Sequence, residues 1–148
     1  MLSIWEGTTN ILSLDALRAI HKENAAIFFL DDIQKRLNHI NQKELIHSKV
    51  NTQHAMHELK TYILSIPQMS IEEQQTGARQ LAYALARTYA ASLLLEHAQW
   101  SVQKNKDTLP TITAIRWCEK NLSELISFSE NYGKESQLLA MDYNGFHK

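Results

Sequence analysis

The sequence predicts an all-α protein: an antiparallel up-down helical bundle of about four main helices, with a short N-terminal helix and an apolar tail. Three observations lead to this prediction. The 148 residues include only 4 glycines and 2 prolines, so few residues interrupt helices. Apolar residues recur at steps of three or four, as on one face of a helix. The links between these periodic segments are short, which favours antiparallel neighbours in a single domain.

The first two helices follow from the N-terminal third of the chain. Periodicity predicts a short helix from Thr9 to about Lys22, with Gly7 supplying a turn before it and Thr8, Thr9 or Asn10 as its cap. A second helix is expected over residues 25–40. Its apolar stripe consists of Ala26, Phe29, Leu30, Ile33, Leu37 and Ile40.

Two longer helices are expected next. Asn41 with Glu44 three residues later indicates a helix start, and Pro67 fits the end of this helix. Its broader stripe consists of Leu45, Ile46, Val50, Met56, Leu59, Ile63 and Leu64. The spacing of Ser70 and Glu73 is typical of a capping box that begins the central helix over residues 71–104. Its stripe consists of Ala78, Ala82, Leu85, Tyr89, Leu93, Glu96 and Trp100, widened by Leu81, Ala86 and Leu94.

The closing helix is expected to start at Thr108 and Pro110. Its apolar face consists of Ile112, Ile115, Cys118, Leu122, Leu125 and Ile126. Cys118 on that face is interpreted as a small buried hydrophobe rather than a nucleophile. Residues 131–133, Asn-Tyr-Gly, indicate a helix stop, and the apolar tail behind them is expected to dock on the bundle or on a neighbouring subunit.

Composition and charge exclude several classes of protein. The formal net charge of -1 offers no overall attraction to nucleic acid, and no basic cluster suggests a nucleic-acid-binding surface. No apolar run is long enough to span a membrane, and no secretory signal is evident. With one cysteine, we expect the cytoplasm or another reducing compartment. Glu44 and His47 form one Glu-x-x-His element, but a di-metal bundle site needs a second, so we predict no metal site.

Residues 5–10 read Trp-Glu-Gly-Thr-Thr-Asn, and residues 11–18 read Ile-Leu-Ser-Leu-Asp-Ala-Leu-Arg. This stretch resembles the glutamate motif near the C-terminal end of the acyl-CoA dehydrogenase family. The tryptophan and the run that follows it resemble most the branch that includes the adaptive-response flavoprotein AidB and its long-chain relatives. The resemblance covers about the first twenty residues.

The resemblance implies roles for individual residues. Glu6 corresponds to the base that removes the α-proton of an acyl-CoA thioester, and Trp5 corresponds to the aromatic residue that lines the substrate cavity. Gly7, Thr8 and Asn10 match the turn that approaches the FAD cofactor. A carboxylate in a dry pocket has a raised pKa, which suits it to take this weakly acidic proton.

The resemblance also implies a partition of the chain. Residues 1–24 correspond to the end of the dehydrogenase core, and residues 25–148 to the C-terminal helical extension carried by long members of the family. We therefore expect a C-terminal piece of a flavoprotein of fatty-acid metabolism that completes an active site, supports homo-oligomer assembly and is inactive alone. The alternatives are a stand-alone helical self-association module and, less favoured by the charge pattern, a nucleic-acid-binding domain.

Overall fold

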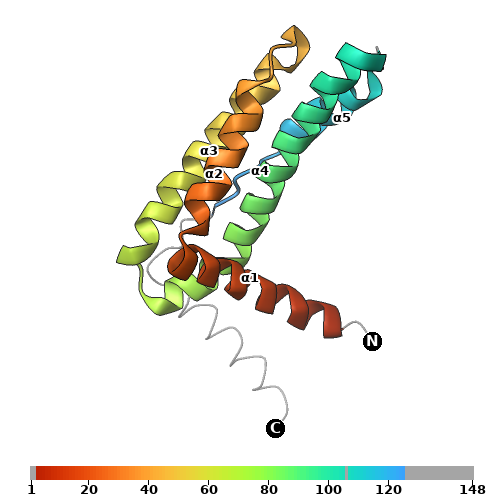
Figure 1. Ribbon diagram of the computed structural model, residues 1–148. Helices are drawn as coiled ribbons and strands as arrows, with labels where there is room; N and C mark the ends of the chain where they lie inside the picture. The colour runs from red at the N-terminus through yellow and green to blue at the C-terminus, as the bar shows by residue number, and fades with distance from the viewer. Residues whose placement is uncertain (1–2, 106, 126–148) are drawn as a thin grey trace.

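The computed structural model describes residues 3–105 and 107–125, and within these ranges it contains helices and no strand (Figure 1). The predicted all-α bundle is thereby confirmed. Two short 3₁₀ turns, Lys43–Leu45 and Ile66–Gln68, separate the second, third and fourth helices. The α-helices are α1 Ser3–Glu23, α2 Ala25–Asn38, α3 Ile46–Ser65, α4 Ile71–Asn105 and α5 Leu109–Cys118.

The helices α2, α3, α4 and α5 run alternately up and down, and each packs on its neighbour in sequence (Figure 1). The long α4 also contacts α2, so it forms the centre of the bundle. The helix α1 crosses the end of the bundle at which α2 and α4 begin, and it packs on both of them (Figure 1). The N-terminal half of α1 projects beyond the side of the bundle (Figure 1).

The start of α1 differs from the sequence prediction. The helix begins at Ser3 rather than Thr9, so the expected turn at Gly7 and the expected cap at residues 8–10 are both wrong. A single internal glycine costs a helix only about 1 kcal/mol relative to alanine, which is not enough to force a turn. The break falls instead at Asn24, where φ is 50° and ψ is 27°. Asparagine tolerates this left-handed conformation better than most residues.

The predicted stripe of α2 is confirmed, since Ala26, Ile33, Leu37 and Ile40 are buried. The start of the next helix is not at Asn41, because the backbone at Gln42 is extended and a 3₁₀ turn precedes α3. The stripe of α3 is only partly correct. Ile46, Val50 and Leu64 are exposed, whereas the buried α3 residues are Ser48, Thr52, Ala55 and Leu59.

The helix α4 begins as predicted. The Ser70 hydroxyl accepts a hydrogen bond from the Glu73 backbone N–H at 3.2 Å, and the Glu73 carboxylate accepts one from the Ser70 N–H at 2.7 Å. The buried face of α4 is rotated from the predicted stripe, because Leu93 and Trp100 are exposed. Small residues on the true buried face allow the other helices to approach closely. This face carries Ala78, Leu81, Ala84, Thr88, Ala91, Ser92, Leu95 and Ala98.

The closing helix α5 is shorter than predicted, since it ends at Cys118. Leu122 is nevertheless buried, but from a non-helical segment, and Ile112 on the predicted face is 46% exposed. The core forms two clusters along α4. One contains Leu37, Leu95 and Cys118 near the α5 end, and the other contains Leu17, Leu59 and Leu81 near α1. The predicted helix stop at residues 131–133 and the apolar tail lie outside the described residues.

Candidate functional site

The motif residues predicted from the resemblance lie in the first turns of α1. Glu6 and its neighbours Trp5, Gly7, Thr8 and Asn10 all have helical backbone. In a helix that begins at Ser3, the backbone N–H groups from Gly7 onward bond to carbonyls four residues earlier. These N–H groups are therefore committed to the helix. This geometry differs from the open turn beside the cofactor that the resemblance implies.

The second half of α1 is anchored to the bundle. Leu17 is 8% exposed and lies in one core cluster with Ala78 and Leu81 of α4. Ser13 is also buried, and its hydroxyl donates to the Thr9 carbonyl at 2.8 Å. Polar side chains of α4 face α1 across a small cavity of about 340 Å³. This cavity is lined by Ser13, Leu14, Gln75, Thr76, Ala78, Arg79 and Gln80.

The other side of α1 presents apolar side chains to solvent. Ile11 and Leu12 are each 62% exposed. Ile27 and Phe28, at the start of α2, are exposed as well. Soluble proteins seldom expose several large apolar side chains together unless another surface covers them. This α1 outer face, defined by Ile11 and Leu12, is thus a candidate contact surface.

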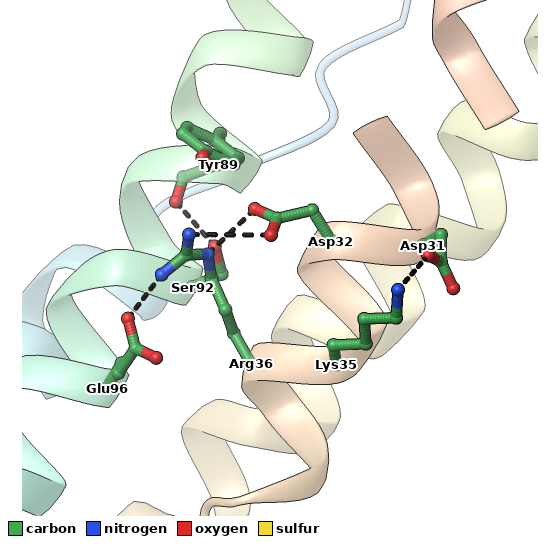
Figure 2. A network of polar contacts seen from close by, with 7 residues as sticks. All are labelled: Asp31, Asp32, Lys35, Arg36, Tyr89, Ser92 and Glu96. Carbon is green, nitrogen blue, oxygen red and sulfur yellow. Dashed lines mark hydrogen bonds and ion pairs between the residues drawn. The ribbon is translucent and has the colours of Figure 1, made fainter. Parts of the chain in front are cut away.

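A polar network joins α2 to α4 (Figure 2). The Arg36 guanidinium binds the Asp32 carboxylate with an Nε–Oδ2 distance of 2.8 Å, and it also donates to Glu96 of α4. The same guanidinium lies 5.7 Å from the centre of the Tyr89 ring. The hydrogen bonds from Arg36 hold the pKa of Asp32 below its usual value, and the acidic partners raise the pKa of Arg36, led by Asp32.

Asp32 and Arg36 are both charged at neutral pH, and their contacts favour these charged forms, so this network joins the two helices by ion pairs. Helical periodicity alone does not predict this network. The available signal was Glu96, a carboxylate within the predicted apolar stripe of α4. A charge in such a position usually has a partner on the facing helix.

Basic side chains on α4 are few and partly neutralised. Arg79 and Arg87 lie over the Tyr83 ring, at 5.7 and 5.8 Å from its centre. Arg87 also forms an ion pair with Glu124 at 3.3 Å. A surface that binds a nucleic-acid backbone normally presents several positive side chains together. This pair alone supplies little of such a surface.

Comparison with known proteins identifies the domain. Residues 24–144 match the family model described as Acyl-CoA dehydrogenase 11 C-terminal domain-like. The chain belongs to this family. It is also similar to acyl-CoA dehydrogenase family member 11 of Caenorhabditis elegans, with 32% identity over 121 residues. The aligned region is 78% of this chain but 19% of that relative, so the chain spans about a fifth of the relative's length. No solved structure matches the chain significantly.

The match confirms that the chain corresponds to the C-terminal region of an acyl-CoA dehydrogenase family protein. The AidB-like branch stays a prediction. The motif residues 5–10 precede the matched range, so their roles also stay predictions.

Within this C-terminal domain, Cys118 is the last residue of α5, where it faces α3, and it is 2% exposed. Its sulfur is 3.6 Å from the Thr52 hydroxyl oxygen. Burial raises the pKa of the Cys118 thiol, so the reactive thiolate is disfavoured. This confirms its interpretation as a buried hydrophobe.

Among the described residues, no group of three or more His, Cys, Asp or Glu side chains is arranged to hold a metal ion. His54 and Glu58, 3.7 Å apart, form an exposed pair on α3. No helix in the described part of the chain is long and apolar enough to cross a membrane.

Proposed function

We propose that this chain is the C-terminal helical part of an FAD-dependent, AidB-like acyl-CoA dehydrogenase of fatty-acid metabolism, and that it completes the active site of that enzyme. The observation that carries the proposal is the order of two features along the chain, the glutamate motif and the family match. The glutamate motif occupies the first turns of α1, and the C-terminal domain match begins at residue 24, where α1 ends. This order supports a partition into residues 1–24, the end of the dehydrogenase core, and residues 25–148, the helical extension.

In this proposal Glu6 is the base that removes the α-proton of an acyl-CoA thioester, and Trp5 lines the substrate cavity. Bound FAD supplies the hydride acceptor for the β-carbon. Because the N–H groups of Gly7, Thr8 and Asn10 are committed to α1, their contacts with the cofactor would come from side chains or Cα atoms. The larger part of the flavin site would belong to the preceding region of the enzyme. The chain alone is therefore expected to be inactive.

The role of Glu6 is tested by the substitution Glu6→Gln in the polypeptide that carries the dehydrogenase region together with this chain. Loss of a general base lowers kcat by about 10²–10⁴-fold. Flavin absorbance should be retained, because the substitution preserves the shape of the side chain. Glu44 is exposed in the 3₁₀ turn between α2 and α3, at the end of the bundle opposite α1 (Figure 1). The substitution Glu44→Gln serves as the matched control and should keep full activity. Full activity of Glu6→Gln would remove Glu6 from the role of base.

The division of the flavin site is tested by the absorbance of the purified 148-residue chain after incubation with FAD. A colourless protein is expected, since most of the site would be missing. A yellow protein that retains FAD through gel filtration would show that these helices hold the cofactor unaided, and the proposed division would then be wrong.

A second function, self-association without catalysis, is favoured by the α1 outer face. Its two large apolar side chains, Ile11 and Leu12, are each 62% exposed. In the intact enzyme the same face would contact either the dehydrogenase region or another subunit. A contact with another subunit would make the enzyme a homo-oligomer. The oligomeric state of the isolated chain distinguishes a face that pairs with itself from one that needs the rest of the enzyme.

A further inference from the structure

The helix α1 is unbroken from Ser3 to Glu23, and it joins the motif to the bundle. Glu6 and Leu17 are separated by eleven residues, or about 16 Å along the helix axis. Eleven residues are close to three full turns, so the backbone positions of both residues share one side of the helix. A turn at Gly7 would have uncoupled the two positions, but the structure has no turn there.

The C-terminal half of α1 packs against α4. Leu17 is buried against Ala78 and Leu81. The first turn of α4, which precedes Ala78 by about one turn, is itself held in place. Besides the Ser70–Glu73 capping box, the Gln74 amide donates to the Ile66 and Met69 carbonyls, both at 3.0 Å.

From this arrangement we propose that Leu17 is a positioning residue for Glu6: the C-terminal domain sets the placement of the carboxylate by holding α1 against α4. This inference rests on the proposed function of Glu6 as the base. It assigns the domain a role in the chemical step itself, in addition to assembly. An error of about 1 Å in the placement of a reacting group can cost about 10²-fold in rate.

The test compares Leu17→Ala with Leu95→Ala in the intact flavoprotein. Both substitutions remove the same atoms from a buried site, but Leu95 is fully buried in the other core cluster, away from α1. Both should lower the melting temperature. Only Leu17→Ala should lower kcat, by about 10²-fold, with KM nearly unchanged. It should also shift the pH profile of kcat, because the surroundings of the base change.

An equal loss of kcat in both variants would reduce the effect to general destabilisation and overturn the proposal. Unchanged kcat and pH profile in Leu17→Ala would also overturn it. The conservative Leu17→Met, which refills the site, should restore kcat. If Leu17→Ala does not fold, the milder Leu17→Val replaces it, with Leu95→Val as its control, and only Leu17→Val should lower kcat. Active Glu6→Gln would instead refute the proposed function. Inactive Glu6→Gln beside fully active Leu17→Ala would refute the positioning role alone.

A second readout uses the 148-residue chain itself. Hydrogen exchange of the backbone amides of residues 7–12 should be faster in Leu17→Ala than in the unsubstituted chain, because α1 loses its seat on α4. Leu95→Ala should leave exchange in this stretch unchanged. Equal exchange rates in Leu17→Ala and the unsubstituted chain would show that α1 is held without Leu17, contrary to the proposal.

Discussion

Gln99 on α4 and Asn41 in the link between α2 and α3 hold each other by paired hydrogen bonds. The Gln99 amide nitrogen donates to the Asn41 side-chain oxygen at 2.7 Å, and the Gln99 oxygen accepts from the Asn41 backbone N–H at 3.0 Å. The same oxygen accepts from the Gln42 N–H at 3.1 Å. The amide of Gln99, which is 6% exposed, thereby fixes the link in front of the 3₁₀ turn, and Asn41 is not the N-terminal cap that the sequence suggested.

Replacing Gln99 should destabilise the bundle, because the substitution Gln99→Leu removes the acceptor for two backbone N–H groups. Leaving such groups unsatisfied costs about 1–3 kcal/mol. The free energy of unfolding, measured by urea denaturation, should fall by this amount. The exposed Gln103→Leu, one turn further along α4, is the control and should change it little. Equal stability of Gln99→Leu and the unsubstituted chain would show that water accepts hydrogen bonds from the Asn41 and Gln42 N–H groups equally well.

The ion pairs of Arg36 should make the free energy of unfolding depend on pH in the acid range. The pKa of Asp32 lies below its usual value of 3.8, chiefly because Arg36 donates hydrogen bonds to it. A depressed folded-state pKa adds stability that is fully present above about pH 4 and is lost as the pH falls through the folded-state value. Urea denaturation at about pH 6 and pH 3 should therefore show a smaller acid-induced loss in Asp32→Asn than in the unsubstituted chain.

The cause of this acid dependence can be tested with Arg36→Met. In that background the main cause of the shift is absent, so adding Asp32→Asn should no longer change the acid-induced loss of stability. If Asp32→Asn and the unsubstituted chain lose the same stability on acidification, the contact between Asp32 and Arg36 does not depress the carboxyl pKa.

The buried Cys118 should be protected from alkylation. A reagent reaches the sulfur only through local opening, and an opening of about 3 kcal/mol slows labelling on the order of 100-fold. Labelling by iodoacetamide, followed by mass spectrometry, should thus be much slower in buffer than in urea. His54→Cys in a Cys118→Ala background places a thiol at an exposed position and should react rapidly in buffer. Similar rates for that thiol and Cys118 would contradict the burial.

The α1 outer face should drive association of the isolated chain. Covering Ile11 and Leu12 in a contact with a second copy removes apolar surface from water. The double substitution Ile11→Glu and Leu12→Glu should therefore shift the mass measured by sedimentation equilibrium toward the monomer. Leu109→Glu, at the opposite end of the bundle and 68% exposed, should leave the mass unchanged. A monomeric unsubstituted chain at high concentration would rule out self-pairing through this face.

Much of the architecture could be predicted from sequence. The capping box of Ser70 and Glu73 and the stripe of α2 are local features, and the structure confirms both. The family of the C-terminal region also followed from a short motif at its edge. The individual roles of Glu6, Trp5, Gly7, Thr8 and Asn10 remain predictions.

The sequence by itself determined that the chain is helical, where most helices lie and which family it resembles, because periodicity and capping act within a few residues. Only the tertiary structure decided which side of α4 is buried, since apolar residues surround much of that helix and the close approach of its neighbours selects the side rich in alanine. Tertiary contacts also placed Gln99 on Asn41 and Arg36 on Glu96. Residues about sixty positions apart in the chain make these contacts, and no local pattern specifies such pairs.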